Sequence, residues 1–309
     1  MRGKREIGED RVIAERETTN TCQSPFKDDE FCPSSYAFQW SKLKFAMHTR
    51  QYVPHRCANF HLKPTTYTNT FACTTARTHW IWEATNMIVR GKAERIPRVK
   101  EEYMVDFIES EKFESLESPR VLNSHFYPSF LPEKLLKENK IIFVARNPKA
   151  VAVSYYRHTF GITETHYNGN FPSFFEMFMK GDVPTGDYFK YTKQWWSVIK
   201  DKPNALIVTY EDASEDFQKV VLTIAEFLDK KISDQLALEI ADMCSFDKMK
   251  KEKKVVKEGL LQITFKENCS FYRSGKVSTW KEWLTVDQSE RLDARIQSEL
   301  IDQEIILNI

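Results

Sequence analysis

One stretch of the chain, residues 140–158 (KIIFVARNPKAVAVSYYRH), constrains the fold more than any other. Residues 141–145 form a short apolar run rich in β-formers, long enough for one buried strand. Arg146 follows this run, Asn147 is suited to cap a helix, and Pro148 suits a helical first turn. The stretch therefore predicts a strand that leads through a short polar turn into a helix, which is where open α/β sheets bind ligands.

Two polar side chains in this stretch are suited to hold an anion. Arg146 stands at the strand end and Ser154 lies along the helix, so together they can bind a phosphate. The alternative is an ordinary buried strand with Arg146 in a structural ion pair. The pattern of this stretch does not by itself decide between the two.

Periodicity elsewhere predicts alternating helices and strands. Helices are expected at 80–90, 133–139, 171–179, 188–200, 214–228, 234–244 and 286–301, and further strands at 121–124 and 205–210. This alternation favours an α/β fold with a parallel sheet and right-handed crossovers. Residues 1–35 are polar and are expected to be loosely ordered. Residues 36–309 are expected to form a single domain, since a chain with 41% hydrophobic residues can bury a large core.

Composition narrows the classes of partner and cofactor. The formal net charge of +1 gives no general attraction for nucleic acid or membranes, so an anion site has to be local. No apolar run approaches the roughly 20 residues of a membrane span, and the charged N-terminus lacks a signal core. These features predict a cytoplasmic protein. Six cysteines are too sparse for a disulfide scaffold, and the spacings of Cys22, Cys32, Cys57 and Cys73 match no zinc pattern, so free thiols and no metal site are expected.

Several motifs in the right order resemble the cytosolic sulfotransferase family. The family's nucleotide-binding segments are similar to V-A-R-N-P-K-D-V-A-V-S-Y-Y and R-K-G-x-x-G-D-W-K, which match residues 140–158 and 271–285 (FYRSGKVSTWKEWLT). Residues 171–196 resemble its F-x-x-G-x-V-P-x-G…W-W stretch, and VTYED at 208–212 resembles its Y-E-D strand end. The resemblance is poor before Trp80. It implies a three-layer, P-loop-like fold with a central parallel sheet flanked by helices.

The chemistry implied by the resemblance is transfer of a sulfuryl group from 3′-phosphoadenosine 5′-phosphosulfate (PAPS) to a small hydroxylated or phenolic acceptor, or to an amine, without a metal. His125 in LNSHFYP matches the family's catalytic histidine. A neutral imidazole can take the acceptor proton as the oxygen attacks sulfur. The alternative is a polar histidine that caps a strand. The position of His125, 16 residues before the strand that begins at Ile141, favours the catalytic base.

The resemblance also implies which residues hold the nucleotide. Arg146 and Ser154 would bind the 3′-phosphate from one side, and Arg273 with the backbone near Gly275 from the other. Aromatic side chains would hold the adenine by stacking. The implied contacts are Thr78, His79, Trp80, Arg146, Ser154, Tyr210, Ser245, Phe246, Arg273, Ser274 and Gly275. Ser274 stands where the family has a lysine, so one cation is missing there.

Residues 71–80 (FACTTARTHW) depart from the family's phosphosulfate loop, T-Y-P-K-S-G-T-T-W. Without gaps, the lysine becomes Thr75 and the glycine becomes Arg77. With a gap, Arg77 takes the lysine's place and is a second candidate catalytic residue. Glycine matters in such a loop because a side chain would obstruct the anion. A further lysine that the resemblance implies, two residues before the histidine, is Asn123.

Three explanations of this loop stay open. The chain is an active, divergent transferase that uses Arg77; or a catalytically impaired relative that still binds PAPS or its product adenosine 3′,5′-bisphosphate (PAP); or the region before Trp80 reflects an error in the gene model. A P-loop kinase, from another class, is disfavoured because the chain has no G-x-x-x-x-G-K-[ST] sequence.

Two further surfaces are expected. Residues 281–290 fit the family's K-x-x-x-T-V-x-x-x-E dimer motif through Lys281, Thr285, Val286 and Glu290. Such a strip can pair antiparallel across a two-fold axis and give a weak homodimer, and Thr285 is equally suited to cap a helix. Aromatic residues are expected either to line an apolar acceptor site or to belong to the core: Phe126, Tyr127, Phe130, Phe160 and Tyr167.

Overall fold

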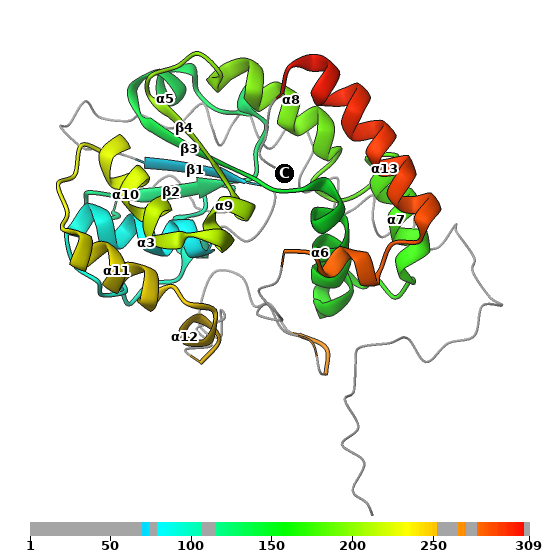
Figure 1. Ribbon diagram of the computed structural model, residues 1–309, viewed down its shortest axis with the longest axis horizontal. Helices are drawn as coiled ribbons and strands as arrows, with labels where there is room; N and C mark the ends of the chain where they lie inside the picture. Colours follow the sequence, from blue (N-terminus) through cyan, green and yellow to red (C-terminus); the bar gives the residue numbers. More distant parts are fainter. Residues whose placement is uncertain are drawn as a thin grey trace, which may run out of the picture. The chain divides into compact units, whose positions relative to one another are not determined.

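A four-stranded parallel sheet lies at the centre of the computed structural model, which describes residues 70–74, 79–106, 115–251, 265–267, 269 and 277–305. The strand order is β2-β1-β3-β4 (Figure 1), and the strands are β1 (Thr70–Thr74), β2 (Val121–Ser124), β3 (Lys140–Ala145) and β4 (Ala205–Thr209). Phe71 of β1 lies level with Leu122 of β2 and Ile141 of β3. The predicted parallel α/β architecture is confirmed.

Helices occupy the segments between and after the strands, close to the predicted positions. They are α3 (His79–Arg90), α5 (Glu133–Glu138), α6 (Pro148–Gly161), α7 (Phe171–Met179), α8 (Tyr188–Ile199), α9 (Tyr210–Glu215), α10 (Phe217–Phe227), α11 (Asp234–Met243), α12 (Phe246–Lys251) and α13 (Val286–Glu299). The helix predicted over 214–228 is confirmed over Phe217–Phe227, but it begins later than predicted, because Asp216 leaves the helical conformation and separates α9 from α10. The Asp216 carboxylate accepts a hydrogen bond from the backbone N–H of Lys219 and so caps α10.

The central strand β1 is absent from the sequence predictions, which assign residues 71–80 to a loop. Residues 70–74 instead pair with β2 on one side and β3 on the other. Five residues without clear alternation give no local signal, and the strand is defined by its two neighbours. Only residues 75–78 separate β1 from α3.

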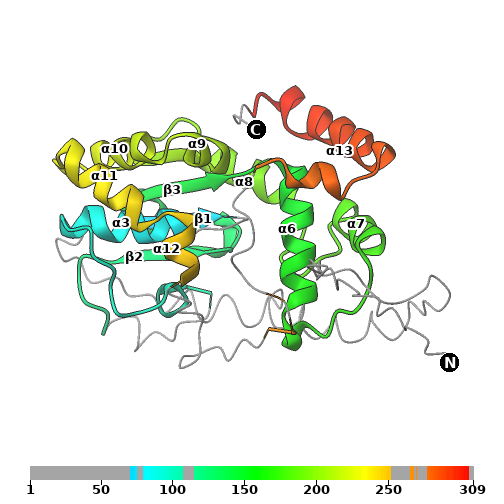
Figure 2. The ribbon, with the colours of Figure 1, turned by 60° about the horizontal axis from the view of Figure 1, so that its bottom comes forward.

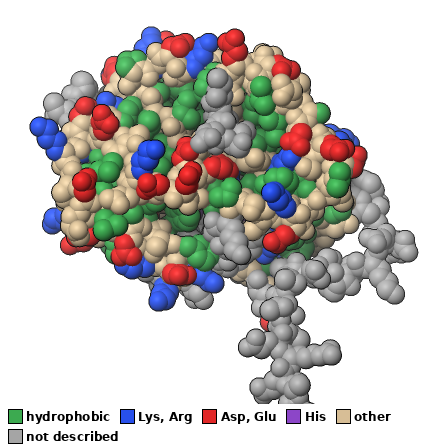
Figure 3. Space-filling view, in the orientation of Figure 1, with side chains coloured by type: hydrophobic (Ala, Val, Ile, Leu, Met, Phe, Trp, Pro, Cys, Tyr) green, Lys and Arg blue, Asp and Glu red, His purple; other side chains and the backbone are tan. Residues whose placement is uncertain are grey.

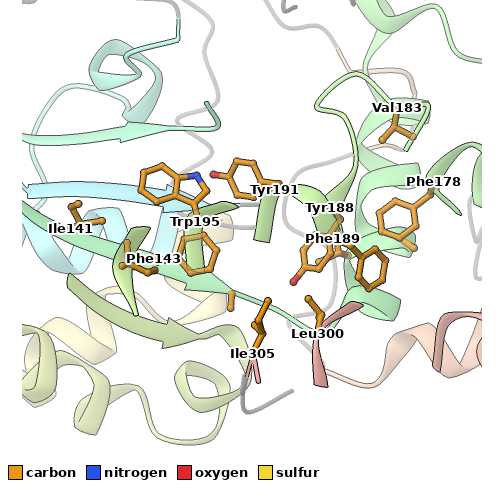
Figure 4. Packing of buried hydrophobic residues seen from close by; sticks show 14 of the residues in the cluster. Ile141, Phe143, Phe178, Val183, Tyr188, Phe189, Tyr191, Trp195, Leu300 and Ile305 are labelled. Carbon is orange, nitrogen blue, oxygen red and sulfur yellow. The ribbon is translucent and has the colours of Figure 1, made fainter. Parts of the chain in front are cut away.

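The sheet is buried on both faces, which gives the molecule its three layers. Along β3, Ile141 and Phe143 face one core while Ile142 and Val144 face the other. The second core includes residues of α3, α10 and α11, which gather on one side of the sheet in Figure 1. In the first core, Phe143 packs against Trp195 of α8 (Figure 4), and the centres of the two rings lie 6.1 Å apart. Burying one such side chain stabilises the folded state by about 1.5–3 kcal/mol relative to leaving it exposed.

The turn from β3 into α6 forms as the sequence predicts. The Asn147 side chain accepts a hydrogen bond of 2.9 Å from the backbone N–H of Lys149, and Pro148 occupies the first turn of α6. The Tyr188 hydroxyl donates a 2.7 Å hydrogen bond to the carbonyl of Arg146, which holds the turn against α8. The turn is therefore held by the hydrogen bond from α8 and by the cap at the start of α6.

The described residues all lie within one compact unit, Cys32–Ile309. Residues 1–35 lie outside the described part, so the predicted boundary at residue 36 stays a prediction. Within the described ranges, none of the helices has the length and apolar character needed to cross a membrane. Cys244 is a buried free thiol.

Candidate functional site

The predicted site residues follow the ends of parallel strands. β1 leads into residues 75–78, β2 into His125, β3 into Arg146 and β4 into Tyr210. Because the carboxyl ends of parallel strands meet at the same edge, His125, Arg146 and Tyr210 lie along one edge of the sheet. Figure 2 shows the arrowhead of β3 pointing toward α6, which starts at this edge. The chain passes from β1 to β2 on one side and returns to β3 on the other, so β1 and β3 flank a topological switch point.

Arg146, Tyr210 and Trp80 form a stack at this edge. The Arg146 guanidinium carbon lies 4.0 Å from the centre of the Tyr210 ring, within the range of a cation–π contact. The Trp80 ring stacks on Tyr210 with ring centres 5.6 Å apart and an interplanar angle of 20°. Arg146 and Tyr210 are each 3% exposed. The structure thus brings together three predicted nucleotide contacts from three separate segments.

Glu211, which follows Tyr210, ties β4 to the turn after β3. Its carboxylate accepts a 3.1 Å hydrogen bond from the backbone N–H of Asn147. Burial raises the pKa of Glu211, while this hydrogen bond and the charge of Arg146 act in the opposite direction. The acidic side chain thus positions the backbone beside Arg146.

His125 is anchored by a buried carboxylate that sequence reasoning missed. Its backbone N–H donates to both carboxylate oxygens of Asp106, at 3.2 and 3.0 Å, and Ser124 Oγ donates to the same carboxylate at 3.0 Å. The imidazole Nδ1 lies 3.9 Å from Asp106 Oδ2, too far for a hydrogen bond. Asp106 therefore fixes the backbone at His125 through hydrogen bonds that do not involve the imidazole.

The electrostatic surroundings keep the His125 imidazole neutral. Burial, followed by the positive charge of Lys100, lowers its pKa to about 3. Burial raises the pKa of Asp106 to about 6, although its hydrogen bonds from His125 and Ser124 act against this. A neutral imidazole at neutral pH is the form that can accept a proton from a hydroxyl.

Lys100 and Asn123 form a second buried pair beside β2. Lys100 Nζ donates a 3.0 Å hydrogen bond to Asn123 Oδ1, and Asn123 Nδ2 donates a 2.9 Å hydrogen bond to the Lys100 carbonyl. Burial lowers the pKa of Lys100, while the charges of Glu101 and Asp106 act to raise it. Lys100 carries no sequence signal, because it lies in a polar run that matches no motif.

The next residue, Glu101, pairs with a predicted nucleotide contact. His79 Nε2 and Glu101 Oε1 lie 3.1 Å apart. Burial favours the neutral carboxyl, but the hydrogen bond and charge of His79 prevail and hold the pKa of Glu101 at about 2. His79 begins α3 immediately after residues 75–78, so this pair tethers the end of the predicted phosphosulfate loop.

Other predicted contacts lie nearby or outside the described residues. Ser154 is half-buried on α6. Ser245 and Phe246 follow Cys244, whose Sγ lies 4.0 Å from the Trp80 carbonyl oxygen. Five predicted site residues lie outside the described part of the chain: Arg77, Thr78, Arg273, Ser274 and Gly275. The convergence of Arg146 and Arg273 on one phosphate therefore stays a prediction.

Aromatic side chains follow His125 directly. Phe126, Tyr127 and Phe130 are half-buried, and the Phe130 ring lies edge-on to Phe126 at 6.3 Å and to Tyr127 at 6.1 Å. Tyr167, by contrast, is 2% exposed and packs against Tyr156 in the core. Of the two roles open for these aromatic residues, Tyr167 takes the core one.

The predicted dimer strip lies on the surface at the start of α13. Thr285 caps this helix by accepting a hydrogen bond from the backbone N–H of Gln288, whose side chain bonds back to Thr285 N. Val286 is 75% exposed. Lys281 and Glu290 are also exposed.

Comparison with known proteins yields one family. The family model for the sulfotransferase domain matches residues 42–304. That match begins well before Trp80, earlier than the motifs alone indicate. Sulfotransferase 1E1 of Homo sapiens is 33% identical over 238 residues, covering 72% of this chain and 80% of the relative. Sulfotransferase 1A1 of Rattus norvegicus is 33% identical over 238 residues, covering 73% of this chain and 81% of the relative.

Two solved structures are similar in fold. Mouse sulfotransferase SULT7A1 complexed with PAP superposes with a TM-score of 0.66 at 24% identity, covering 82% of this chain and 90% of that one. Retinol dehydratase in complex with androsterone and the inactive cofactor PAP gives a TM-score of 0.71 at 22% identity, covering 87% of this chain and 96% of that one. The predicted P-loop-like fold is confirmed.

Proposed function

This chain belongs to the sulfotransferase family, and on that premise we propose that it transfers a sulfuryl group from PAPS to a hydroxyl or amine of a small molecule. The observation that carries the proposal is the stack of Arg146, Tyr210 and Trp80 at the same sheet edge as His125. The mouse sulfotransferase and retinol dehydratase structures were both determined with PAP, which supports the choice of nucleotide.

The described residues fit an anionic purine nucleotide. Arg146 supplies a buried guanidinium suited to a phosphate, and Trp80 supplies a half-buried ring suited to a base. Acidic and basic side chains are interspersed over the face shown in Figure 3. With a net charge of +1, attraction for the nucleotide has to come from such local cations. We assign the 3′-phosphate to Arg146 and Ser154, together with Arg273.

In this mechanism His125 is the general base and takes the proton of the acceptor hydroxyl. The donor supplies the sulfuryl group, which forms a bond to the acceptor oxygen as its bond to the phosphate oxygen breaks and PAP leaves. Asp106 holds the backbone of His125, so the imidazole keeps its position during proton transfer. Arg77 is the proposed cation for the leaving phosphate oxygen.

The acceptor class that we propose is supported by the residues after His125. Phe126, Tyr127 and Phe130 are half-buried aromatic side chains directly after the proposed base, which favours a small phenol or another apolar hydroxyl compound. Androsterone in the retinol dehydratase structure is an acceptor-sized molecule of that kind. The homodimer through residues 281–290 and the cytoplasmic location remain parts of the proposal that rest on the sequence.

Transfer of labelled sulfate from PAPS to a panel of phenols and hydroxysteroids tests the proposal. We expect product with the wild-type protein and a loss of at least about 10²-fold in kcat for His125→Ala, the usual contribution of a general base. PAP binding should be kept in this variant, because His125 is assigned to the acceptor side. PAP binding without transfer to any acceptor would favour the binding-only alternative, and full turnover by His125→Ala would refute the assigned base.

A further inference from the structure

The Lys100 ammonium is a buried charge without a carboxylate partner among the described residues. Lys100 is 4% exposed, and the hydrogen bond from its Nζ goes to the neutral amide oxygen of Asn123 at 3.0 Å. A buried ammonium is costly unless an anion and further hydrogen bonds compensate for its lost hydration. In the described structure two of its three N–H donors have no such partner.

The two carboxylates whose charges act on Lys100 interact with other groups. Glu101 lies 3.1 Å from the imidazole of His79, and Asp106 accepts the backbone N–H of His125 and the hydroxyl of Ser124. Neither lies within 4.0 Å of the Lys100 ammonium as an ion pair in the described residues. The ammonium is thus left with capacity for an anion from outside the protein.

Lys100 is also placed beside the proposed reaction centre. Its partner Asn123 lies on β2, two residues before His125. Asn123 lies level with Ala72 of β1, the strand that leads into residues 75–78. The charge of Lys100 reaches His125, because it contributes to lowering the pKa of that imidazole.

We propose that the Lys100 ammonium, held in place by Asn123, binds the sulfuryl group of the donor and stabilises its oxygens during transfer. This inference rests on the proposed function. As the acceptor oxygen bonds to sulfur, the electron pair of the broken bond leaves with the phosphate oxygen and the acceptor proton passes to His125. A fixed cation at this point stabilises the negative charge on the sulfuryl oxygens. Asn123 stands where the family resemblance implies a lysine, so the charge comes from a different segment of the chain.

Calorimetric titration of PAPS and PAP separates this role from a structural one. Lys100→Met keeps much of the length of the side chain and removes its positive charge. We expect the ratio of PAPS to PAP affinity to fall by at least about tenfold, since charge-assisted hydrogen bonds to the sulfuryl group are lost while PAP has no such group. The double variant Lys100→Met/Asn123→Lys returns the charge to β2 and should recover part of that ratio.

The pKa of the His125 imidazole gives an independent check of the charge at Lys100. In the nucleotide-free protein, the NMR-detected pKa of the His125 imidazole should rise in Lys100→Met, because a positive neighbour that opposes protonation is removed. Should Lys100→Met fail to fold, Asn123→Asp places a carboxylate against the ammonium, and it should lower the same affinity ratio.

These measurements distinguish a failure of the role of Lys100 from a failure of the proposed function. If the folded variants bind PAPS and PAP with the wild-type ratio, or if the pKa of His125 stays unchanged in Lys100→Met, the role of Lys100 is refuted and the proposed function stands. If the wild-type protein binds neither nucleotide, the proposed function fails and this inference fails with it.

Discussion

Asp106 shows how single residues set the electrostatics of the site. Its carboxylate is 6% exposed and accepts hydrogen bonds from the backbone of His125 and from Ser124. Sequence reasoning found His125 from its motif, but Asp106 and Lys100 lie in segments without a motif, 19 and 25 residues away along the chain. Their importance comes from tertiary contacts, which a one-dimensional pattern does not contain.

The raised pKa of Asp106 predicts a stability change with pH. Its folded value of about 6 exceeds the ordinary 3.8, so the native state binds the proton more tightly than the unfolded chain between about pH 4 and 6. The contribution of this group to the free energy of unfolding therefore falls as pH rises through that window, by roughly 3 kcal/mol. Asp106→Asn lacks the titration but keeps an acceptor oxygen.

Urea unfolding of both proteins at pH 4, 5, 6 and 7 measures this effect. The free energy of unfolding of Asp106→Asn, relative to the wild type, should increase from pH 4 to pH 6 and then level off. A difference that stays constant with pH would show that Asp106 titrates at its ordinary pKa.

Local pattern predicted some elements and not others. The turn from β3 to α6 was predicted residue by residue, because Asn147 and Pro148 act within their own segment. The strand β1 was missed, because residues 70–74 become a strand through pairing with β2 and β3. The loop after β1 lies outside the described residues, so Arg77 keeps its role only as a prediction.

Helix α13 offers a test of the two roles of Thr285. Because Thr285 and Gln288 form a reciprocal cap at the start of this helix, Thr285→Ala should lower the free energy of unfolding by about 1 kcal/mol, whereas Thr285→Ser should retain most of it. Chemical denaturation measures both. An unchanged stability in Thr285→Ala would show that the cap is dispensable, leaving self-association as the role of this residue.

Helix α8 supports the segment that carries the base. Trp195 is fully buried, and its indole N–H donates a 3.1 Å hydrogen bond to the carbonyl of Phe126, next to His125. Trp195→Ala should cost about 3–5 kcal/mol of stability through the cavity it leaves. Trp195→Phe, which keeps the ring packing and loses the hydrogen bond, should cost less. Equal losses in denaturant titrations of the two variants would contradict a packing role for Trp195.

At the scale of the whole molecule, the sequence predicts a weak homodimer through residues 281–290. Lys281 and Glu290 are exposed, and neither makes an ion pair among the described residues, so both charges are available to a second copy. Lys281→Glu should weaken association by placing like charges opposite each other, and the double variant Lys281→Glu/Glu290→Lys should restore it. Sedimentation equilibrium measures the association constant. Identical association in all three proteins would exclude this strip as the interface.

The central claim is that a sulfuryl donor nucleotide binds at the carboxyl edge of the sheet through Arg146. Calorimetric titration of PAP into the wild-type protein and into Arg146→Ala tests it most directly. We predict binding of PAP by the wild-type protein, and an affinity at least about tenfold lower in the variant, since a charge-assisted contact to phosphate is lost. Wild-type protein that binds no PAP, or Arg146→Ala that binds it equally well, would contradict the claim.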